Sequence, residues 1–440
     1  TLFVYECAVG SCDSGTELPA ASNTSMGLGV SVSLVGDELL SGASYAAVFS
    51  HGGQGKVFSF RWSGSHWLEA PALDTGIGYQ AGAFGLAVAS EGRTMIACAR
   101  DTPAQAGTCY VYERVASGWS LRQQMAPLDP RYFAYFGSSV ALSGDVAVVG
   151  APGRGSAYVF QRSASGFWAQ RARFDGAASA NFGQVVAVRG DTVAVGAPIT
   201  AFPPGLGAVH VFERAGESWA EREMFLGSDV ERLGSSIAIG DNLILAGAPG
   251  GEGPGAALVF ARNAGTWSLQ QVLAPTDQQA RMEFGAAVAL DGDRALVGAP
   301  RASAGPEGAT GVVYELARVA GSWTQPGFIT ASDRGVGDEF GSGIVLEDGR
   351  ALIASRYHRW GVEGYIRGAV YVHDLTDAGT WNETAQLRLP ESGTSPAIAI
   401  AGECLLVGAF AATTESGPFA NPQSGGVYSF GCNLFGDGFE

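Results

Sequence analysis

The residues in this sequence best able to do chemistry are six cysteines and five histidines. The cysteines are Cys7, Cys12, Cys98, Cys109, Cys404 and Cys432. No two of them form a Cys-x-x-Cys pair and the histidines are scattered, so the ligand spacing of a zinc cluster is missing. An even number of cysteines without metal spacing indicates disulfides, which form in oxidising compartments. We therefore predict a secreted or cell-surface protein with no bound metal and no cofactor.

Sequence motifs of common enzymes are absent. There is no nucleophile elbow, HExxH motif, P-loop or paired-carboxylate signature, so we predict no catalytic residues and a protein that is not an enzyme. His210 and His373 stand in apolar runs and are interpreted as packed strand residues. Arg189-Gly190-Asp191 spells a tripeptide that integrins recognise, but a tight turn also explains its glycine and aspartate, and we favour the turn.

One segment concentrates basic and aromatic side chains, in a chain with only 26 lysines and arginines against 42 acidic residues. Its members are Arg356, Tyr357, His358, Arg359, Trp360, Tyr365 and Arg367. Arginine and aromatic residues are frequent anchors of protein interfaces and of carbohydrate sites. We predict that this segment binds a protein or carbohydrate ligand, with Tyr132, Phe133 and Tyr135 joining it on the same face. An ordinary solvated loop is the alternative.

The overall charge excludes some partners. The net charge of −16 repels phosphate backbones, so nucleic acid is not an expected partner. Only 15% of residues are charged, which separates the chain from disordered polyanions. The most apolar stretch, 397–413, contains Glu403 and two glycines, so we predict strands there and no membrane span.

One pattern recurs eight times along the chain. Its clearest copy opens with Phe136-Gly137, has Gly144-Asp145 in the middle and closes with Gly150-Ala151-Pro152. The closing glycine follows the opening glycine by 13 residues in this copy. The eight copies have their opening glycine, or its equivalent, at positions 29, 85, 137, 183, 234, 285, 341 and 395. Such self-similarity at a nearly fixed period indicates a repeat architecture.

Each copy has the features of four strands, named A to D. Strands A and B flank the Gly-Asp turn, strand C follows, as in Ala157–Phe160, and strand D usually opens with tryptophan. These tryptophans are Trp119, Trp168, Trp219, Trp267, Trp323 and Trp381. A four-stranded sheet that is apolar on both faces must be covered on both, which radial packing achieves. We predict an all-β propeller of eight four-stranded blades, with seven as the alternative.

The repeat resembles the FG-GAP family, best known from the propeller of integrin α chains. The resemblance covers about residues 27–430 and implies the same fold. Calcium-binding members carry an acidic DxDxDG-like loop between strands A and B, whereas this chain has a tight turn such as Ser143-Gly144-Asp145. Too few oxygen ligands converge there for calcium, so we predict none. The last segment, 433–440, resembles short FxDGFE tails of secreted bacterial repeat proteins.

The repeat register predicts the disulfides. Cys98 ends strand B of the second copy and Cys109 opens its strand C, which places them opposite each other across an antiparallel ladder. The same register in the last copy brings Cys404 near Cys432. Cys7 and Cys12 are close enough in sequence to close a small loop.

Strand order also predicts where ligands bind. In an up-and-down blade the A–B and C–D turns share one face, and the longer B–C and D–A loops share the other. We predict an extracellular binding or adhesion protein that uses the second face. The alternatives are a structural protomer that self-associates into a filament and a propeller-type polysaccharide lyase or hydrolase.

The strand count does not balance at the chain ends. The last copy lacks a D strand, and the segment around Glu17-Leu18 stands where one belongs. We predict a single propeller over residues 1–432, closed by pairing of N- and C-terminal strands, followed by the tail 433–440. Residues 2–5 are then surplus, available as a fifth strand or for pairing with another molecule.

Overall fold

The structure is a computed structural model of the 440-residue chain. It describes residues 2–3, 17–18, 28–44, 46, 53–63, 67–75, 82–101, 106–199, 205–277, 279–306, 308–360, 365–366, 368–388, 395–401, 404–410 and 426–430. Strands dominate these residues, and the short 3-10 turns η2 (Pro152–Arg154) and η3 (Ala178–Ala180) lie in loops. Among them, no helix has the length and apolar character needed to cross a lipid bilayer.

Seven antiparallel sheets have four strands each. The first three are β3 (Leu28–Val35), β4 (Glu38–Ala43), β5 (Lys56–Trp62) and β6 (Trp67–Glu69); β7 (Phe84–Glu91), β8 (Thr94–Ala99), β9 (Thr108–Val115) and β10 (Gly118–Met125); and β11 (Ser139–Ser143), β12 (Val146–Ala151), β13 (Ser156–Arg162) and β14 (Trp168–Asp175). The next two are β15 (Val185–Arg189), β16 (Thr192–Ala197), β17 (Ala208–Ala215) and β18 (Ser218–Leu226); and β19 (Ser236–Ile239), β20 (Leu243–Ala248), β21 (Ala256–Asn263) and β22 (Thr266–Leu273). The last two are β23 (Ala287–Asp291), β24 (Arg294–Ala299), β25 (Val312–Val319) and β26 (Ser322–Ile329); and β27 (Phe340–Glu347), β28 (Arg350–Ser355), β31 (Ala369–Leu375) and β32 (Trp381–Arg388).

Smaller sheets complete the described strands. The eighth sequence copy forms a three-stranded sheet of β33 (Ser395–Ala401), β34 (Cys404–Phe410) and β35 (Gly426–Phe430). Two short ribbons are formed by β1 (Leu2–Phe3) with β2 (Glu17–Leu18) and by β29 (Arg359–Trp360) with β30 (Tyr365–Ile366).

The predicted β-propeller fold is confirmed. The seven four-stranded sheets match the alternative of seven such blades. The expectation of eight four-stranded blades was wrong in strand number, because the eighth copy contributes three strands among the described residues.

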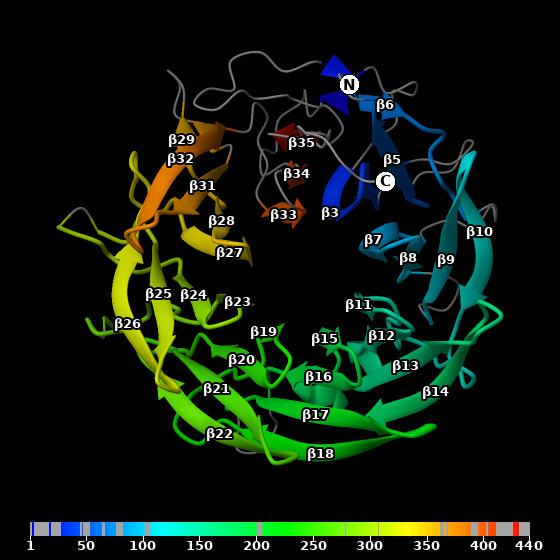
Figure 1. The fold of residues 1–440 in the computed structure, drawn as a ribbon, viewed down its shortest axis with the longest axis horizontal. Coiled ribbons are helices and arrows are strands. Elements are labelled where there is room, and N and C mark those ends of the chain that lie inside the picture. Colours follow the sequence, from blue (N-terminus) through cyan, green and yellow to red (C-terminus); the bar gives the residue numbers. More distant parts are fainter. Residues whose placement is uncertain are drawn as a thin grey trace. The chain divides into compact units, whose positions relative to one another are not determined.

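Two compact units are distinguished along the chain, and most of the second is the continuous stretch Gln123–Leu346. Within this stretch each sheet presents its strands in sequence order, with β11, β15, β19 and β23 on the inner side and β14, β18, β22 and β26 on the outer side (Figure 1). The outer strands are sheet edges. The first residue of β14 is the repeated tryptophan, and the first residue of β18, β22 and β26 is the one just before it.

Close approach between neighbouring repeats explains the repeated glycines. A Cβ atom on Gly150 would lie 2.0 Å from the carbonyl oxygen of Gly183, the opening glycine of the next repeat. The same position in the fifth repeat, Gly247, would place a Cβ atom 1.9 Å from the carbonyl oxygen of Gly285. Such distances exclude any side chain, so packing between neighbouring repeats requires glycine at both of these strand positions.

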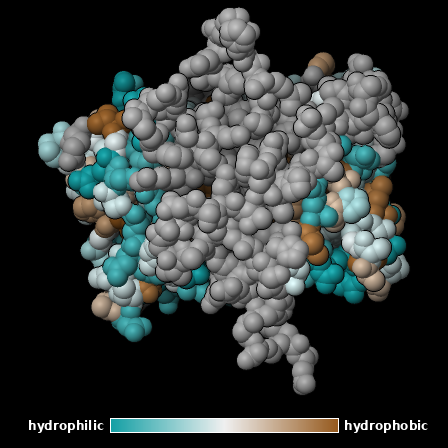
Figure 2. All heavy atoms as spheres, turned by 90° about the horizontal axis from the view of Figure 1, so that it is seen from above, coloured by the Kyte–Doolittle hydropathy of each residue, from teal (hydrophilic) through white to brown (hydrophobic). Residues whose placement is uncertain are grey.

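The phenylalanine of each opening pair belongs to the core. Phe136 packs edge-on against Tyr158 of its own strand C, with ring centroids 5.4 Å apart. Phe284 meets Tyr314 in the same way at 5.2 Å. These buried aromatic pairs join the opening phenylalanine of a repeat to strand C of the same repeat. The coloured surface in Figure 2 mixes hydrophilic residues with scattered hydrophobic ones.

The first and last repeats are neighbours within the other compact unit. A Cβ atom on Gly408 would lie 2.5 Å from the carbonyl oxygen of Gly29, which repeats the contact between successive copies. Residues 17–18 pair with residues 2–3 and not with the last repeat, and β1 lies beside β35. The predicted pairing of residues 17–18 with the last repeat is therefore not seen, and closure of one propeller by the terminal strands stays a prediction.

The register prediction for the second copy is confirmed. Cys98 and Cys109 are both disulfide-bonded, and one disulfide is present in the described part of the chain. The predicted Cys404–Cys432 and Cys7–Cys12 bonds involve side chains outside the described residues and remain predictions.

Candidate functional site

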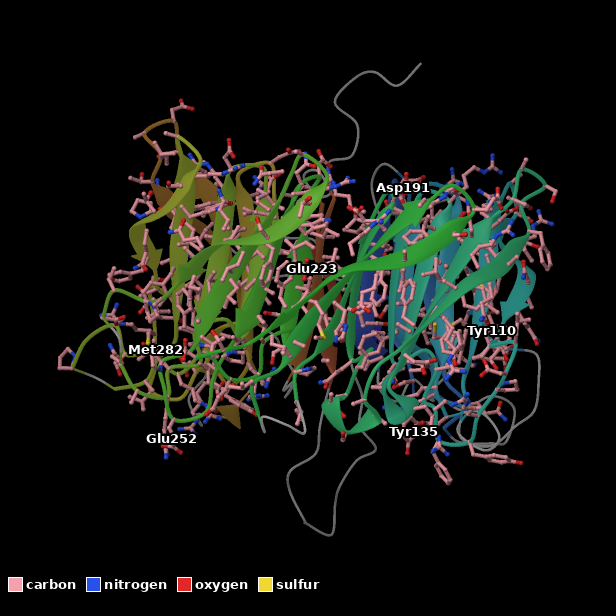
Figure 3. All side chains as sticks on the ribbon, turned by 90° about the horizontal axis from the view of Figure 1, so that it is seen from below. Tyr110, Tyr135, Asp191, Glu223, Glu252 and Met282 are labelled. Atoms are coloured by element: carbon pink, nitrogen blue, oxygen red, sulfur yellow. The ribbon has the colours of Figure 1, made fainter. Side chains whose placement is uncertain are left out.

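Loops of different lengths occupy the two ends of the strands in Gln123–Leu346. Figure 3 shows Asp191, in an A–B turn, at one end, and Tyr135 and Glu252, in a D–A and a B–C loop, at the opposite end. This is the arrangement that antiparallel strand order dictates. The end with the longer loops is called the loop face.

The predicted basic-aromatic segment is described only in part. Arg356 and Tyr357 are half-buried, and Arg359 is exposed. His358 is only 2% exposed, and its Nδ1 lies 3.5 Å from the hydroxyl of Tyr371 on strand β31. The side chains of Trp360, Tyr365 and Arg367 lie outside the described residues. His358 therefore packs beneath the loop, and ligand binding by the segment stays a prediction.

The second predicted group lies on loop 126–138, which joins β10 to β11. Tyr132 is 67% exposed and Phe133 is 55% exposed, whereas Tyr135 is half-buried. Leu128, which the sequence did not single out, is 82% exposed on the same loop. The sequence signal for its exposure was a proline on each side, because a segment between prolines cannot pair with a neighbouring strand. Three large apolar side chains are thus exposed within six residues.

Hydrogen bonds hold this loop in place. Arg154 donates through Nε to the carbonyl oxygen of Tyr132 at 2.8 Å, and the amide of Gly153 donates to the carbonyl oxygen of Ala134 at 3.2 Å. The amide of Leu128 donates to Oε1 of Gln170, on the outer strand of the next repeat, at 3.0 Å. The exposed side chains therefore project from a backbone that is fixed at three points.

The backbone of the loop is also strained. Phe133 and Tyr135 have φ values of 57° and 55°, in the left-handed region that non-glycine residues rarely adopt. The residue just before the opening pair adopts this conformation in several repeats, namely Ala83, Tyr135, Asn181, Arg232, Glu283 and Glu339. The strain at Tyr135 thus belongs to the repeat. At the position of Phe133, Arg281 is the other non-glycine residue with a positive φ in the part of the chain that the structure describes.

Charged groups flank the exposed side chains. Arg131 lies 3.3 Å from Asp129, and both are about half exposed. Arg173 of β14 also pairs with Asp129, and it binds Asp175 at 2.7 Å. The loop is therefore a cluster of apolar and aromatic side chains with arginines at its border, which we call the aromatic loop patch (Leu128, Arg131, Tyr132, Phe133 and Arg154).

The Arg-Gly-Asp sequence lies in the A–B turn, as interpreted from the sequence. Nε of Arg189 lies 2.5 Å from Asp241, and Asp191 lies 3.4 Å from Arg214. Both charged side chains are thus engaged by neighbours, which supports a structural role for this turn.

The two strand histidines are packed, as predicted. The ring of His210 meets the ring of Phe182 edge-on at 4.8 Å, and its Nδ1 lies 2.7 Å from Glu221. His373 is 2% exposed, and burial lowers its pKa to about 4 from the usual 6.5. Neither belongs to a group of three or more possible metal ligands, because none is found among the described residues.

Comparisons with known proteins agree with this architecture. The FG-GAP repeat family matches residues 119–160, 168–212 and 267–315. No curated protein matches the chain. The solved structure of Sqt1 from Chaetomium thermophilum has a TM-score of 0.58 at 10% identity, covering 88% of this chain and 93% of that chain. This identity supports likeness of fold alone.

Two other solved structures have lower similarity. A protein from Lactobacillus plantarum has a TM-score of 0.48 at 11% identity, covering 81% of this chain and 98% of that chain. A protein of Bacteroides uniformis, provisionally named a 6-phosphogluconolactonase, has a TM-score of 0.49 at 12% identity, covering 80% of this chain and 97% of that chain. We draw no functional argument from either likeness.

Proposed function

We propose that this chain, in which FG-GAP repeats match at three places, is an extracellular binding protein that recognises a partner protein through its loop face. The repeats form a rigid scaffold, and loops held on such a scaffold commonly carry recognition. The disulfide of Cys98 and Cys109 supports an oxidising, extracellular location.

The observation that carries the proposal is the aromatic loop patch. Leu128, Tyr132 and Phe133 are 82%, 67% and 55% exposed, although exposure of large apolar side chains to water is unfavourable. Because the backbone beneath them is fixed, little conformational entropy is lost when a partner binds. Exposed aromatic residues beside arginine are the composition of energetic hot spots in protein interfaces.

We further propose that the protein binds without catalysis. Leu128, Phe133 and the arginines of the patch are neither nucleophiles nor general bases, which leaves the hydroxyl of Tyr132 as the one group of the patch able to take either role. The segment 356–367, with Arg359 exposed, is proposed as a second contact region.

The first prediction tests the patch directly. The double variant Tyr132→Ser with Phe133→Ser should weaken partner binding at least tenfold, because it removes two apolar anchors and leaves the fold unchanged. Partners would be found by probing an array of purified extracellular proteins with the wild-type chain, and their affinities measured by biolayer interferometry.

A matched control is Phe167→Ser. Phe167 is 59% exposed but lies in the turn between β13 and β14, away from the loop face. Its substitution should change affinity less than twofold. Equal losses for the two variants, or an unchanged affinity for the double variant, would contradict the proposed loop-face site.

A further inference from the structure

Two glutamines connect neighbouring repeats by the same pair of hydrogen bonds. Gln123 donates through Nε2 to the carbonyl oxygen of Trp168 at 2.5 Å and accepts from the amide of Trp168 at 2.8 Å. Gln271 makes both bonds with the main chain of Trp323, at 2.8 and 2.9 Å. In both places a side-chain carboxamide pairs with the main-chain N–H and C=O of the tryptophan near the start of the next outer strand.

The third repeat has alanine at the place of this glutamine. Ala172 pairs with Val159 across β13 and β14, as Gln271 pairs with Val259 across β21 and β22. Both residues also stand four positions after the tryptophan of their own outer strand. The methyl group of Ala172 can form no hydrogen bond to the next repeat.

The partner position in the fourth repeat is Trp219. It pairs with Arg214 across β17 and β18, as Trp168 pairs with Arg162 across β13 and β14. Because the register is the same, the main-chain N–H and C=O of Trp219 point toward the preceding repeat, as those of Trp168 point toward Gln123. Trp219 thus presents the donor and acceptor that a carboxamide satisfies in two other repeats.

An open groove occupies the space beside Ala172. Its volume is about 510 Å³, which lies in the range of small-ligand sites. The residues that line it are Arg171, Ala172, Arg173, Phe174, Asp175, Phe212, Glu217, Ser218, Trp219 and Glu221. Arg171 of β14 and Glu217 of the β17–β18 turn approach each other to 3.8 Å. The groove is formed by the outer strands β14 and β18 with Phe212 of β17 and the β17–β18 turn, and not by the loops of the aromatic loop patch.

We propose that this groove binds an acetamido sugar, whose amide group takes the place of the missing glutamine carboxamide on the main chain of Trp219. The N–H and C=O of an acetamido group form the same donor and acceptor pair as a glutamine side chain. Trp219 supplies an aromatic wall for the pyranose ring, and the side chains of Arg171, Ser218 and Glu221 supply donors and acceptors for its hydroxyl groups. The site is independent of the loop-face function proposed above.

The second prediction is that Ala172→Gln closes the groove. The new glutamine should bond to Trp219 as Gln271 bonds to Trp323, which should raise the thermal midpoint and weaken binding of an N-acetylglucosamine trisaccharide at least tenfold. Binding would be measured by isothermal titration calorimetry and unfolding by circular dichroism. A glucose trisaccharide, which lacks the amide, should not bind the wild-type chain measurably.

Two further variants and one further ligand complete the experiment. Ala169→Gln introduces the same side chain three residues away on β14, outside the groove, and should bind the trisaccharide as the wild type does. Arg171→Ala, at an exposed position, should weaken binding at least fivefold. The proposal is overturned if the wild type does not bind the acetamido trisaccharide, if Ala172→Gln binds it normally, or if a glutamine-containing tripeptide binds in place of the sugar.

Discussion

His373 occupies the place in strand C that phenylalanine holds in other repeats, at Phe160, Phe212 and Phe260. Burial keeps its imidazole neutral, with a pKa of about 4 in the folded chain against the usual 6.5. Between about pH 4 and pH 6.5, the unfolded chain therefore binds more protons at this residue than the folded chain does. Stability is retained above pH 6.5 and is lost as the pH falls through this window.

The third prediction follows at this residue. His373→Phe should be more stable than the wild type in acid, by on the order of 3 kcal/mol near pH 4 and by less at pH 7.5, because its side chain has no proton to gain. Glu383, whose Oε2 lies 3.9 Å from Nε2, and Asp374 are the acidic neighbours and stay unchanged. Urea unfolding over this pH range measures the difference in unfolding free energy between the two proteins. If their unfolding free energies changed with pH in the same way, the buried histidine would not be neutral.

A glycine at the junction of two repeats provides a second residue-scale test. Gly247→Ala would place a methyl carbon 1.9 Å from the carbonyl oxygen of Gly285, and this contact cannot be relieved without displacing β20 or the main chain that leads into β23. The fourth prediction is a loss of about 3 kcal/mol in unfolding free energy, as for other overpacked core sites. Gly253→Ala is the control, because nothing lies within 4 Å of its Cβ position, and it should change stability by less than about 0.5 kcal/mol. Similar losses for both would contradict the packing explanation.

At the scale of elements, the sequence predicted the strands and much of their register. The Gly-Asp turn and the following strand C place Cys98 opposite Cys109, and both are disulfide-bonded. This register could be predicted because the copies share internal spacing, so that one hairpin constrains the others. The missing fourth strand of the last copy could not be assigned in this way, because residues 2–3 and 17–18 stand outside the repeat.

The candidate sites were less predictable from the sequence than the strands. Tyr132 and Phe133 were expected on the loop face and are exposed, but the same reasoning placed His358 among the ligand-binding residues, where it is buried against Tyr371. Composition does not determine the path of a long loop, so it cannot separate a packed side chain from a projecting one. The groove at Ala172 becomes visible only when the glutamine–tryptophan bonds of other repeats are known.

At the scale of the whole molecule, ion pairs repeat from one blade to the next. An arginine stands at the last or next-to-last position of strand C in five successive repeats, at Arg114, Arg162, Arg214, Arg262 and Arg318. Arg214 reaches Asp145 of the preceding repeat at 3.5 Å, and Arg262 reaches Glu213 of the preceding repeat at 2.9 Å. In a chain with a net charge of −16, such pairs place positive charge between acidic neighbours and reduce their repulsion.

Glu213 is a buried carboxylate, at 5% exposure, and it joins the fourth and fifth repeats. It accepts a hydrogen bond from the indole of Trp267 at 2.7 Å and also contacts Arg222 at 3.3 Å. The fifth prediction is that Glu213→Gln lowers the unfolding free energy by about 2 kcal/mol, because the charge is lost while the shape is kept and two arginines lose their partner. In a repeat array the total stability is close to the sum of the stabilities of the repeats and of their interfaces, so weakening one interface should also broaden the unfolding transition seen by calorimetry.

Glu217→Gln is the control, because it removes an 85% exposed carboxylate only four residues away and should cost less than about 1 kcal/mol. Equal effects of the two substitutions would mean that net charge, and not the buried junction, determines how strongly these repeats are held together.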